Sequence, residues 1–160
     1  MKAIVAVDKE WGIGKDNGLL FRLPADMAFF KQNTLNTVVV MGRKTLQSFP
    51  GSKPLKDRVN IVLSKSGFTA EGVTVVNSVS ELLETLKKYE QQVFVIGGAS
   101  IYNLLLNYCE EIIVTKVDAV GNADTFFPNL DENANFELVN TSEVVETNGY
   151  NITFNTYKRK

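Results

Sequence analysis

Short apolar runs recur along the chain and predict a series of strands. The runs are rich in valine and isoleucine, and several do not alternate with polar residues, which is typical of strands covered on both faces. They are Ala3–Val7, Val38–Met41, Asn60–Leu63, Val73–Val76, Val93–Ile96 and Ile112–Thr115.

Helical patterns separate many of these runs. One covers Ala25–Gln32, a second follows Ser78, which stands in capping-box spacing with Glu81, and a third is ASIYNLLLNY after Gly97-Gly98. Strands that alternate with helices favour crossover connections and a largely parallel sheet between helical layers.

The C-terminal part has a different pattern. Asn148-Gly149 stands between two extended segments, and Tyr150, Ile152 and Phe154 alternate with polar residues. This pattern predicts a hairpin, so antiparallel strands finish one edge of the sheet. We therefore expect one three-layer α/β domain with a mixed sheet, spanning residues 1–160.

The composition narrows the class of protein. A net charge of −1 gives no reason to expect nucleic acid or an anionic membrane as partner. No apolar run is long enough to span a bilayer, and the start MKAIVAVDKE is charged too soon for a signal peptide, so we expect a cytoplasmic protein. Cys109 is the only cysteine, which excludes an intramolecular disulfide.

Histidine is absent from the chain. Ser-His and Cys-His nucleophiles and His-ligated metals are therefore excluded, and we expect no metal. Any acid–base chemistry must use a carboxylate, tyrosine, lysine or water.

Asp26 is the first candidate for such chemistry. It stands in the first turn of a predicted helix and borders an apolar stripe of Met27, Phe29 and Phe30, where a carboxylate can bind a planar, amidine-like ring. The alternative is an acid that complements the helix dipole after Pro24, and spacing alone favours that alternative. The loop Trp11–Phe21, punctuated by glycine, precedes this helix.

Two strand-to-helix junctions could bind phosphate. Gly97-Gly98 allows close approach of the backbone, although taken alone the two glycines favour an ordinary tight turn between strand and helix. Gly42–Thr45 ends like a P-loop but lacks the upstream glycine, so we reject that motif. Its two cations, matched by Ser64-Lys65 after the next strand, make an anion site plausible, such as one for an adenosine 2′-phosphate. Each cation alone would be a solvated surface charge.

Taken together, these motifs resemble one family, the dihydrofolate reductases. The similarity runs from end to end, and its ordered set of markers is Ala6-Val-Asp8, Gly12-Ile-Gly-Lys-Asp16, Leu23-Pro-Ala-Asp26, Phe30, Met41-Gly-Arg-Lys-Thr45, Pro54-Leu55, Arg58-Val-Asn60, Val95-Ile-Gly-Gly98, Tyr102, Ile113-Val-Thr115 and Asp124-Thr-Phe-Phe-Pro128. The resemblance implies a mostly parallel sheet of about eight strands, flanked by about four helices. It also implies NADPH-dependent reduction of 7,8-dihydrofolate, binding of antifolate inhibitors and a monomer.

The resemblance also implies roles for individual residues. Asp26 would bind the 2-amino-4-oxo edge of the pterin with Thr115 as its hydroxyl partner, and would favour protonation at N5 through a water. Arg58 would pair with the α-carboxylate of the glutamate tail. The apolar slot for the substrate would consist of Ile4, Val5, Met27, Phe30, Phe49, Leu55 and Ile96. Without the resemblance, Thr115 and Arg58 are an ordinary core residue and a solvated charge.

The cofactor would lie along the glycine-rich strand ends. Arg43, Ser64 and Lys65 would read the 2′-phosphate, and Tyr102 would stand near the reacting rings. The remaining contacts with NADPH would come from Ala6, Ile13, Gly14, Leu19, Gly42, Lys44, Thr45, Leu63, Ile96, Gly97, Gly98, Ala99, Ser100 and Ile101. The Trp11–Phe21 loop would close over the nicotinamide.

The chain departs from the family pattern in one loop and its neighbour. Leu20-Phe21 replaces the usual Pro-Trp, so an indole N–H that could hold a water is lost and the loop backbone is freer. Ala123 stands where the family often has glycine, in a segment expected to contact that loop.

Two alternatives remain open: a pyrimidine reductase of riboflavin synthesis with the same fold, and a non-catalytic nucleotide-binding module.

Overall fold

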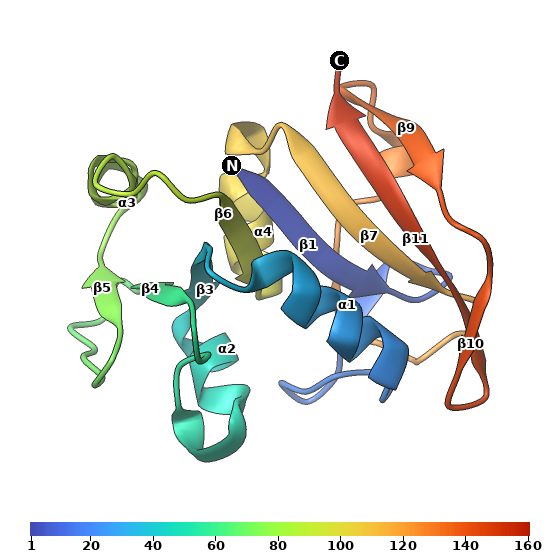
Figure 1. The fold of residues 1–160 in the computed structure, drawn as a ribbon, viewed down its shortest axis with the longest axis horizontal. Helices are drawn as coiled ribbons and strands as arrows, with labels where there is room; N and C mark the ends of the chain where they lie inside the picture. Colours follow the sequence, from blue (N-terminus) through green and yellow to red (C-terminus); the bar gives the residue numbers. More distant parts are fainter.

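The computed structural model describes all 160 residues, and a sheet of nine strands runs through it. The strand order is β10-β11-β7-β1-β6-β3-β4-β5, and β9 also pairs with β11 (Figure 1). The strands of this sheet are β1 (Lys2–Val7), β3 (Val38–Gly42), β4 (Val59–Leu63), β5 (Thr74–Val76), β6 (Val93–Gly97), β7 (Glu111–Val117), β9 (Phe136–Thr141), β10 (Val145–Thr147) and β11 (Tyr150–Arg159).

The helices cover both faces of this sheet. They are α1 (Pro24–Thr34), α2 (Arg43–Ser48), α3 (Val79–Leu86) and α4 (Ala99–Leu105), with short 3-10 turns at η1 (Pro50–Ser52), η2 (Leu106–Tyr108) and η3 (Leu130–Glu132). Figure 1 shows α1 in front of β1 and α4 behind it. The prediction of a three-layer α/β fold is therefore confirmed.

Alternation along the strands decides which helix each side chain meets. On β1, Ile4 packs with Phe29 and Phe30 of α1, whereas Ala3 and Val5 lie in the large cluster that includes residues of α3 and α4. This alternation is what the pleat of a strand imposes, and burial on both faces explains why the strands read as continuous apolar runs.

The sheet is parallel from β5 to β7 and antiparallel beyond it. The pairs β1–β6, β1–β7, β3–β6, β3–β4 and β4–β5 are parallel, and β11 pairs antiparallel with β7, β9 and β10. The turn between β10 and β11 has positive φ at both Asn148 (50°) and Gly149 (84°), as a two-residue hairpin turn requires. The predicted C-terminal hairpin is confirmed.

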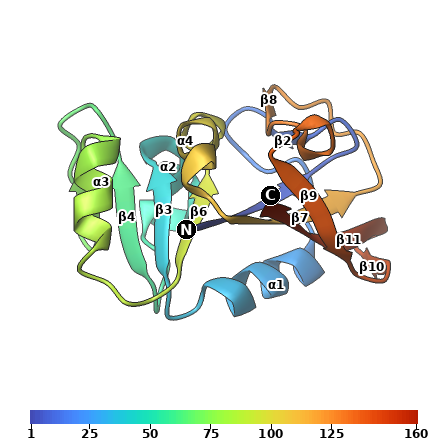
Figure 2. The same cartoon turned by 90° about the horizontal axis from the view of Figure 1, so that it is seen from above.

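Three strands were not predicted. A separate ribbon joins β2 (Gly12–Gly14) to β8 (Thr125–Phe126), and Figure 2 shows it on the far side of the sheet from α1. The third is the edge strand β9. The ribbon strands are too short and too glycine-rich to give a periodic signal, and β9 is exposed after its first residue, Phe136. No helix is long and apolar enough to cross a membrane.

Candidate active site

Three parallel strands end side by side. Gly42 of β3 pairs with Leu63 of β4, and its neighbour Met41 pairs with Gly97 of β6. The chain enters α2 directly after Gly42 and α4 directly after Gly98. The carboxyl edge of the sheet therefore brings together the two junctions that the sequence singled out, as expected for a ligand site in an open α/β sheet.

The Asp26 carboxylate lies next to the same edge. Thr115 Oγ1 of β7 donates a hydrogen bond of 2.6 Å to Asp26 Oδ1. Burial raises the pKa of the Asp26 carboxyl above its ordinary value of 3.8, and the hydrogen bond from Thr115 opposes that rise. Thr115 is in turn the register partner of Ala6 on β1, so the carboxylate and Ala6 approach from adjacent strands.

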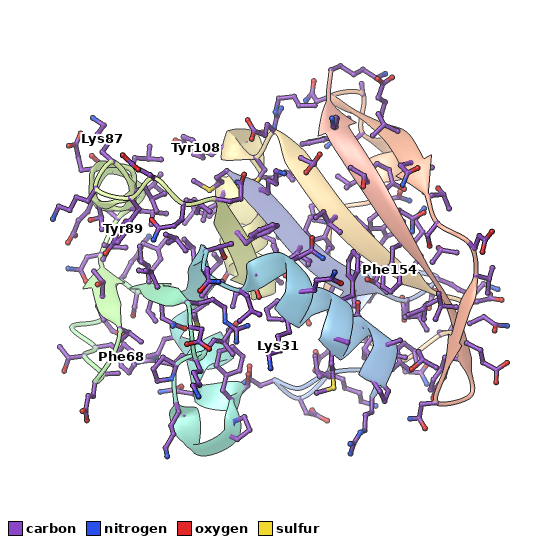
Figure 3. All side chains as sticks on the ribbon, viewed as in Figure 1. Lys31, Phe68, Lys87, Tyr89, Tyr108 and Phe154 are labelled. Carbon is purple, nitrogen blue, oxygen red and sulfur yellow. The ribbon has the colours of Figure 1, made fainter.

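Aromatic packing holds α1 against the sheet. The ring of Phe29 stacks on Phe154 of β11 with centroids 4.0 Å apart, and Figure 3 shows Phe154 beside this helix. Phe30 packs on the same face, against the buried cluster of Ile4, Phe94 and Ile113. Because Asp26 lies one turn before these rings, their packing directs its carboxylate towards the sheet.

Ile96 joins two apolar groups that line the space beside Asp26. It packs against the buried cluster that contains Ile4, as Phe30 does, and against the buried cluster that contains Met41, as Phe49 and Leu55 do. Met27, next to Asp26 on α1, is 56% exposed, so its side chain is available to contact a ligand. The side chain of Val5 is not part of this group, since it lies on the opposite face of the sheet.

Asn60, for which no role was predicted, fixes the Leu55–Arg58 segment. The Asn60 side chain is buried, accepts from the Leu55 N–H at 2.9 Å and donates to the carbonyls of Leu55 and Arg58. Arg58 donates to Thr34 Oγ1 at 3.0 Å and to the Lys56 carbonyl. Burial lowers the pKa of Arg58 below its ordinary value, but a guanidinium stays charged at neutral pH.

The glycines at the strand ends create a close approach between β3, β6 and their helices. A Cβ on Gly97, whose φ is +134°, would meet Thr45 Oγ1 at 3.4 Å, and a Cβ on Gly42 would meet Ile101 Cγ1 at 3.0 Å. Neither α2 nor α4 has a side-chain cap, so the first N–H groups of each helix are free to bind a ligand. Ala99 and Ser100 supply two of them.

Exposed cations and hydroxyls surround the start of α2. Arg43 Nη1 donates to Ser66 Oγ at 3.1 Å, and Ser64 Oγ lies 3.1 Å from the same oxygen. Lys44 and Lys65 are exposed. Ser66 was missed because a serine in a loop carries no pattern, although its position two residues after Ser64 was a usable signal.

Tyr102 is buried behind this edge and its hydroxyl is already engaged. It donates to the Ile4 carbonyl at 2.6 Å, and burial raises its pKa far above the ordinary value of 10.0. Its ring lies against Gly97, with Cε2 3.8 Å from a Cβ placed there. The hydroxyl is therefore fixed as a protonated donor to the backbone.

The two departures from the family pattern meet in one pair of loops. Leu20 and Phe21 pack on Gly121, with Leu20 Cδ1 3.0 Å from a Cβ placed on that glycine. Ala123 of the same segment contacts Gly12, and Asp124 Oδ2 accepts from the Asp16 N–H at 2.9 Å. Within the loop, Ile13 is half-buried, Gly14 is buried and Leu19 is 80% exposed.

A hollow of about 440 Å³ between β1, β7 and β11 shares none of the predicted site residues. Its charged lining forms the ion pairs Lys9–Asp118 and Lys116–Asp131. Because these charges are matched within the chain, we place the site at the carboxyl edge, where the cations and the buried carboxylate lack such partners.

A parallel sheet with a glycine-rich carboxyl edge and a buried carboxylate beside it defines a class of enzymes that bring a flat heterocycle against a nucleotide. The sequence comparisons then identify the family: the profile described as dihydrofolate reductase matches residues 1–159. The chain belongs to the dihydrofolate reductase family, which confirms the resemblance.

Individual relatives support this assignment. Dihydrofolate reductase from Bacillus subtilis is 38% identical, covering 98% of this chain and 93% of its own length, and the Haemophilus influenzae enzyme is 35% identical with 98% and 97% covered. A solved structure, dihydrofolate reductase from Enterococcus faecalis complexed with NADP(H) and RAB-propyl, superposes with a TM-score of 0.88 at 37% identity, covering 99% of this chain and 95% of that one.

Longer relatives match over part of their length. The bifunctional dihydrofolate reductase-thymidylate synthase of Glycine max is 42% identical over 81% of this chain. This chain spans only 28 to 34% of the length of four such plant proteins.

Proposed function

We propose that this protein reduces 7,8-dihydrofolate to 5,6,7,8-tetrahydrofolate with NADPH. A hydride is added at C6 and a proton at N5, and NADP⁺ is the second product. The observation that carries the proposal is the half-buried Asp26, hydrogen-bonded to Thr115 and adjacent to the strand that carries Ala6. Full-length similarity to the two bacterial reductases supports it.

On the substrate side, Asp26 and Thr115 bind the 2-amino-4-oxo edge of the pterin. Ionised Asp26 accepts from the ring, and its raised pKa keeps a proton available at higher pH than an ordinary carboxyl would. Because the carboxylate does not reach N5 directly, the proton arrives through a water. Ile4, Phe30 and Ile96 exclude other water from the ring.

The outer part of the substrate lies between α1 and the Phe49–Arg58 segment. Phe49, Leu55 and the exposed Met27 contact its apolar middle. Arg58 pairs with the α-carboxylate of the tail, and Asn60 holds Leu55 and Arg58 in place for that contact. A guanidinium suits this role because two parallel N–H groups match a carboxylate.

The carboxyl edge of the sheet fits NADPH for two reasons. The glycines let a pyrophosphate approach the backbone, and the uncapped starts of α2 and α4 offer N–H groups to it, with cations beside them. When bound, NADPH supplies the hydride. Gly42–Thr45 would hold one end of the pyrophosphate and Gly97–Ile101 the other, with a further contact from Leu63. The 2′-phosphate would be bound by Arg43, Ser64, Lys65 and Ser66. The nicotinamide would be bordered by Ala6, Ile13, Gly14 and Tyr102, and Leu19 would contact it when the loop closes.

One assay tests the reaction. Oxidation of NADPH, followed by absorbance, should depend on dihydrofolate. Activity with the pyrimidine substrate of riboflavin synthesis and none with dihydrofolate would favour the related reductase, although the matched relatives give that alternative no support. Binding of NADPH without turnover of either substrate would indicate a non-catalytic module.

A second experiment tests the 2′-phosphate contacts. Arg43→Ala should narrow the preference for NADPH over NADH by about tenfold or more, because a charge-assisted bond contributes about 1.5–3 kcal/mol. Lys31→Ala, an exposed cation on α1, is the control. An unchanged ratio of kcat/KM for the two cofactors would contradict this assignment.

We further propose a cytoplasmic monomer in which residues 1–160 form one domain. The bacterial relatives of matching length support the domain assignment. Antifolates should compete with dihydrofolate at Asp26, and no nucleic-acid partner is expected from the net charge of −1.

A further inference from the structure

The helix that carries Asp26 has no N-cap of its own. Leu23 occupies the cap position, and no side chain from the helix or its preceding loop receives the first N–H groups. The Ala25 N–H donates instead to Thr147 Oγ1 at 3.1 Å. Thr147 is the last residue of β10, 122 residues further along the chain, and it is only 8% exposed.

A second hydrogen bond from the same hairpin holds the chain just before the start of α1. Asn148 Nδ2 donates to the Arg22 carbonyl at 3.0 Å. Leu23, between these two bonds, is buried against Val117 and Ile152. The tip of the hairpin therefore holds the four residues 22–25, the last two residues before α1 and the first two of the helix, by a donor at Arg22 and an acceptor at Ala25.

The same hairpin also holds the partner of Asp26. Phe154 on β11 is the register partner of Thr115 on β7. One hairpin thus holds α1 through Thr147 and holds Thr115 through backbone pairing. The 2.6 Å hydrogen bond between Thr115 and Asp26 then joins β7 to α1 directly. Thr147 is the only side chain that accepts a hydrogen bond from the N-terminal backbone of α1.

We propose that Thr147 is a positioning residue for the reductase site: it caps α1 from outside the helix and so sets the Asp26 carboxylate against Thr115. This inference rests on the proposed function. Loss of the Thr147 hydroxyl leaves the Ala25 N–H without its acceptor and lets the first turn of α1 move. A displacement of the acid by a fraction of an ångström is enough to lower turnover.

The test compares three variants. Thr147→Val removes the hydroxyl, Thr147→Ser restores it, and Thr156→Val makes the same change on β11 at a residue that donates no side-chain hydrogen bond. Thr147→Val should lower kcat by about fivefold, the equivalent of about 1 kcal/mol for a lost cap, while KM for NADPH stays unchanged. Thr147→Ser should recover most of the activity.

A second readout separates positioning from simple destabilisation. The titration of Asp26, followed by carboxyl-carbon NMR in the ligand-free protein, should move to higher pH in Thr147→Val, because the bond from Thr115 that lowers its pKa is weakened. Tyr102 is the other ionisable group that Asp26 perturbs, and it stays protonated throughout this range. Lys116, the next residue after Thr115, is paired with Asp131.

The outcomes are distinct. A Thr147→Val protein with the Asp26 titration and kcat of Thr156→Val would overturn the inference, even if its melting temperature falls. If the wild-type protein does not reduce dihydrofolate, the proposed function fails, and the NMR titration still decides whether Thr147 positions Asp26.

Discussion

Two aspartates flank the Trp11–Phe21 loop, the buried Asp8 before it and the half-buried Asp26 in the first turn of α1, and they differ in which hydrogen bonds their oxygens accept. Asp8 is 3% exposed and accepts three backbone N–H groups: Glu10 and Gly12 at 2.8 and 2.7 Å on Oδ1, and Gly121 at 2.9 Å on Oδ2. Asp26 accepts only the hydroxyl of Thr115, on Oδ1.

The difference indicates which carboxylate is available for chemistry. Asp8 joins the start of the Trp11–Phe21 loop to the Gly121 segment, and both of its oxygens are occupied by the fold. Asp26 keeps Oδ2 without a partner in the chain, next to apolar walls that raise its pKa. A buried acid with a free oxygen is suited to bind a ligand, whereas one satisfied by backbone N–H groups stabilises a loop.

The largest effect should come from Asp26→Asn. Removing the acid should lower kcat with dihydrofolate by about 100-fold or more at neutral pH, the usual contribution of a general acid. NADPH should still bind, as measured by fluorescence titration. An unimpaired variant would exclude the proposed role of Asp26 and remove the contrast with Asp8.

The same variant should be more stable than the wild type at neutral pH. Because the pKa of Asp26 is raised in the folded state, ionisation opposes folding above that pKa, and the effect disappears when pH falls below the ordinary value of 3.8. The difference in melting temperature between Asp26→Asn and wild type should therefore be largest at neutral pH and shrink on acidification. A difference that grows on acidification would contradict the sign of the shift.

Asp8→Asn should lower the stability of the fold and have little effect on turnover. An amide can replace one carboxylate oxygen as acceptor, but its NH₂ would face a backbone N–H in a site that is almost fully buried. The cost of about 1–3 kcal/mol should lower the melting temperature by about 5 °C. Turnover per folded molecule should change only a few-fold.

Trp11, the only tryptophan, lies in the same turn, and its backbone N–H donates to the Asp8 carbonyl. Its fluorescence should therefore report the loosened loop in Asp8→Asn. Asp118→Asn, at an exposed carboxylate, is the control. Loss of activity without loss of stability in Asp8→Asn would contradict the assignment of Asp8 to loop stability and of Asp26 to chemistry.

The fold and the position of the two strand-to-helix junctions at the carboxyl edge were predictable because local patterns encode them. Valine-rich runs gave the parallel strands, and Asn148-Gly149 gave the hairpin. Asp26 and Thr115, 89 residues apart, could be paired only through the family resemblance, since spacing alone favoured a helix-dipole acid.

Other site features depend on contacts that no local pattern encodes. Thr147 caps a helix from a distant strand, Asn60 reaches back to Leu55, and Ser66 meets Arg43 across two loops. The side chain of Val5 was expected in the slot, and the pleat of β1 turns it to the opposite face. Tertiary packing decides these details.

The smallest expected effect tests the single hydrogen bond that Asp26 does make. Thr115→Val keeps the shape of the side chain but removes the donor, so the remaining influence, burial, should raise the pKa of Asp26 further. The limb of the pH–rate profile assigned to Asp26 should move to higher pH, and KM for dihydrofolate should rise by about threefold, because one hydrogen bond contributes about 0.5–1.5 kcal/mol. Thr115→Ser should restore both values. A profile that does not move would mean that the Thr115 bond, like those on Asp8, serves the fold alone.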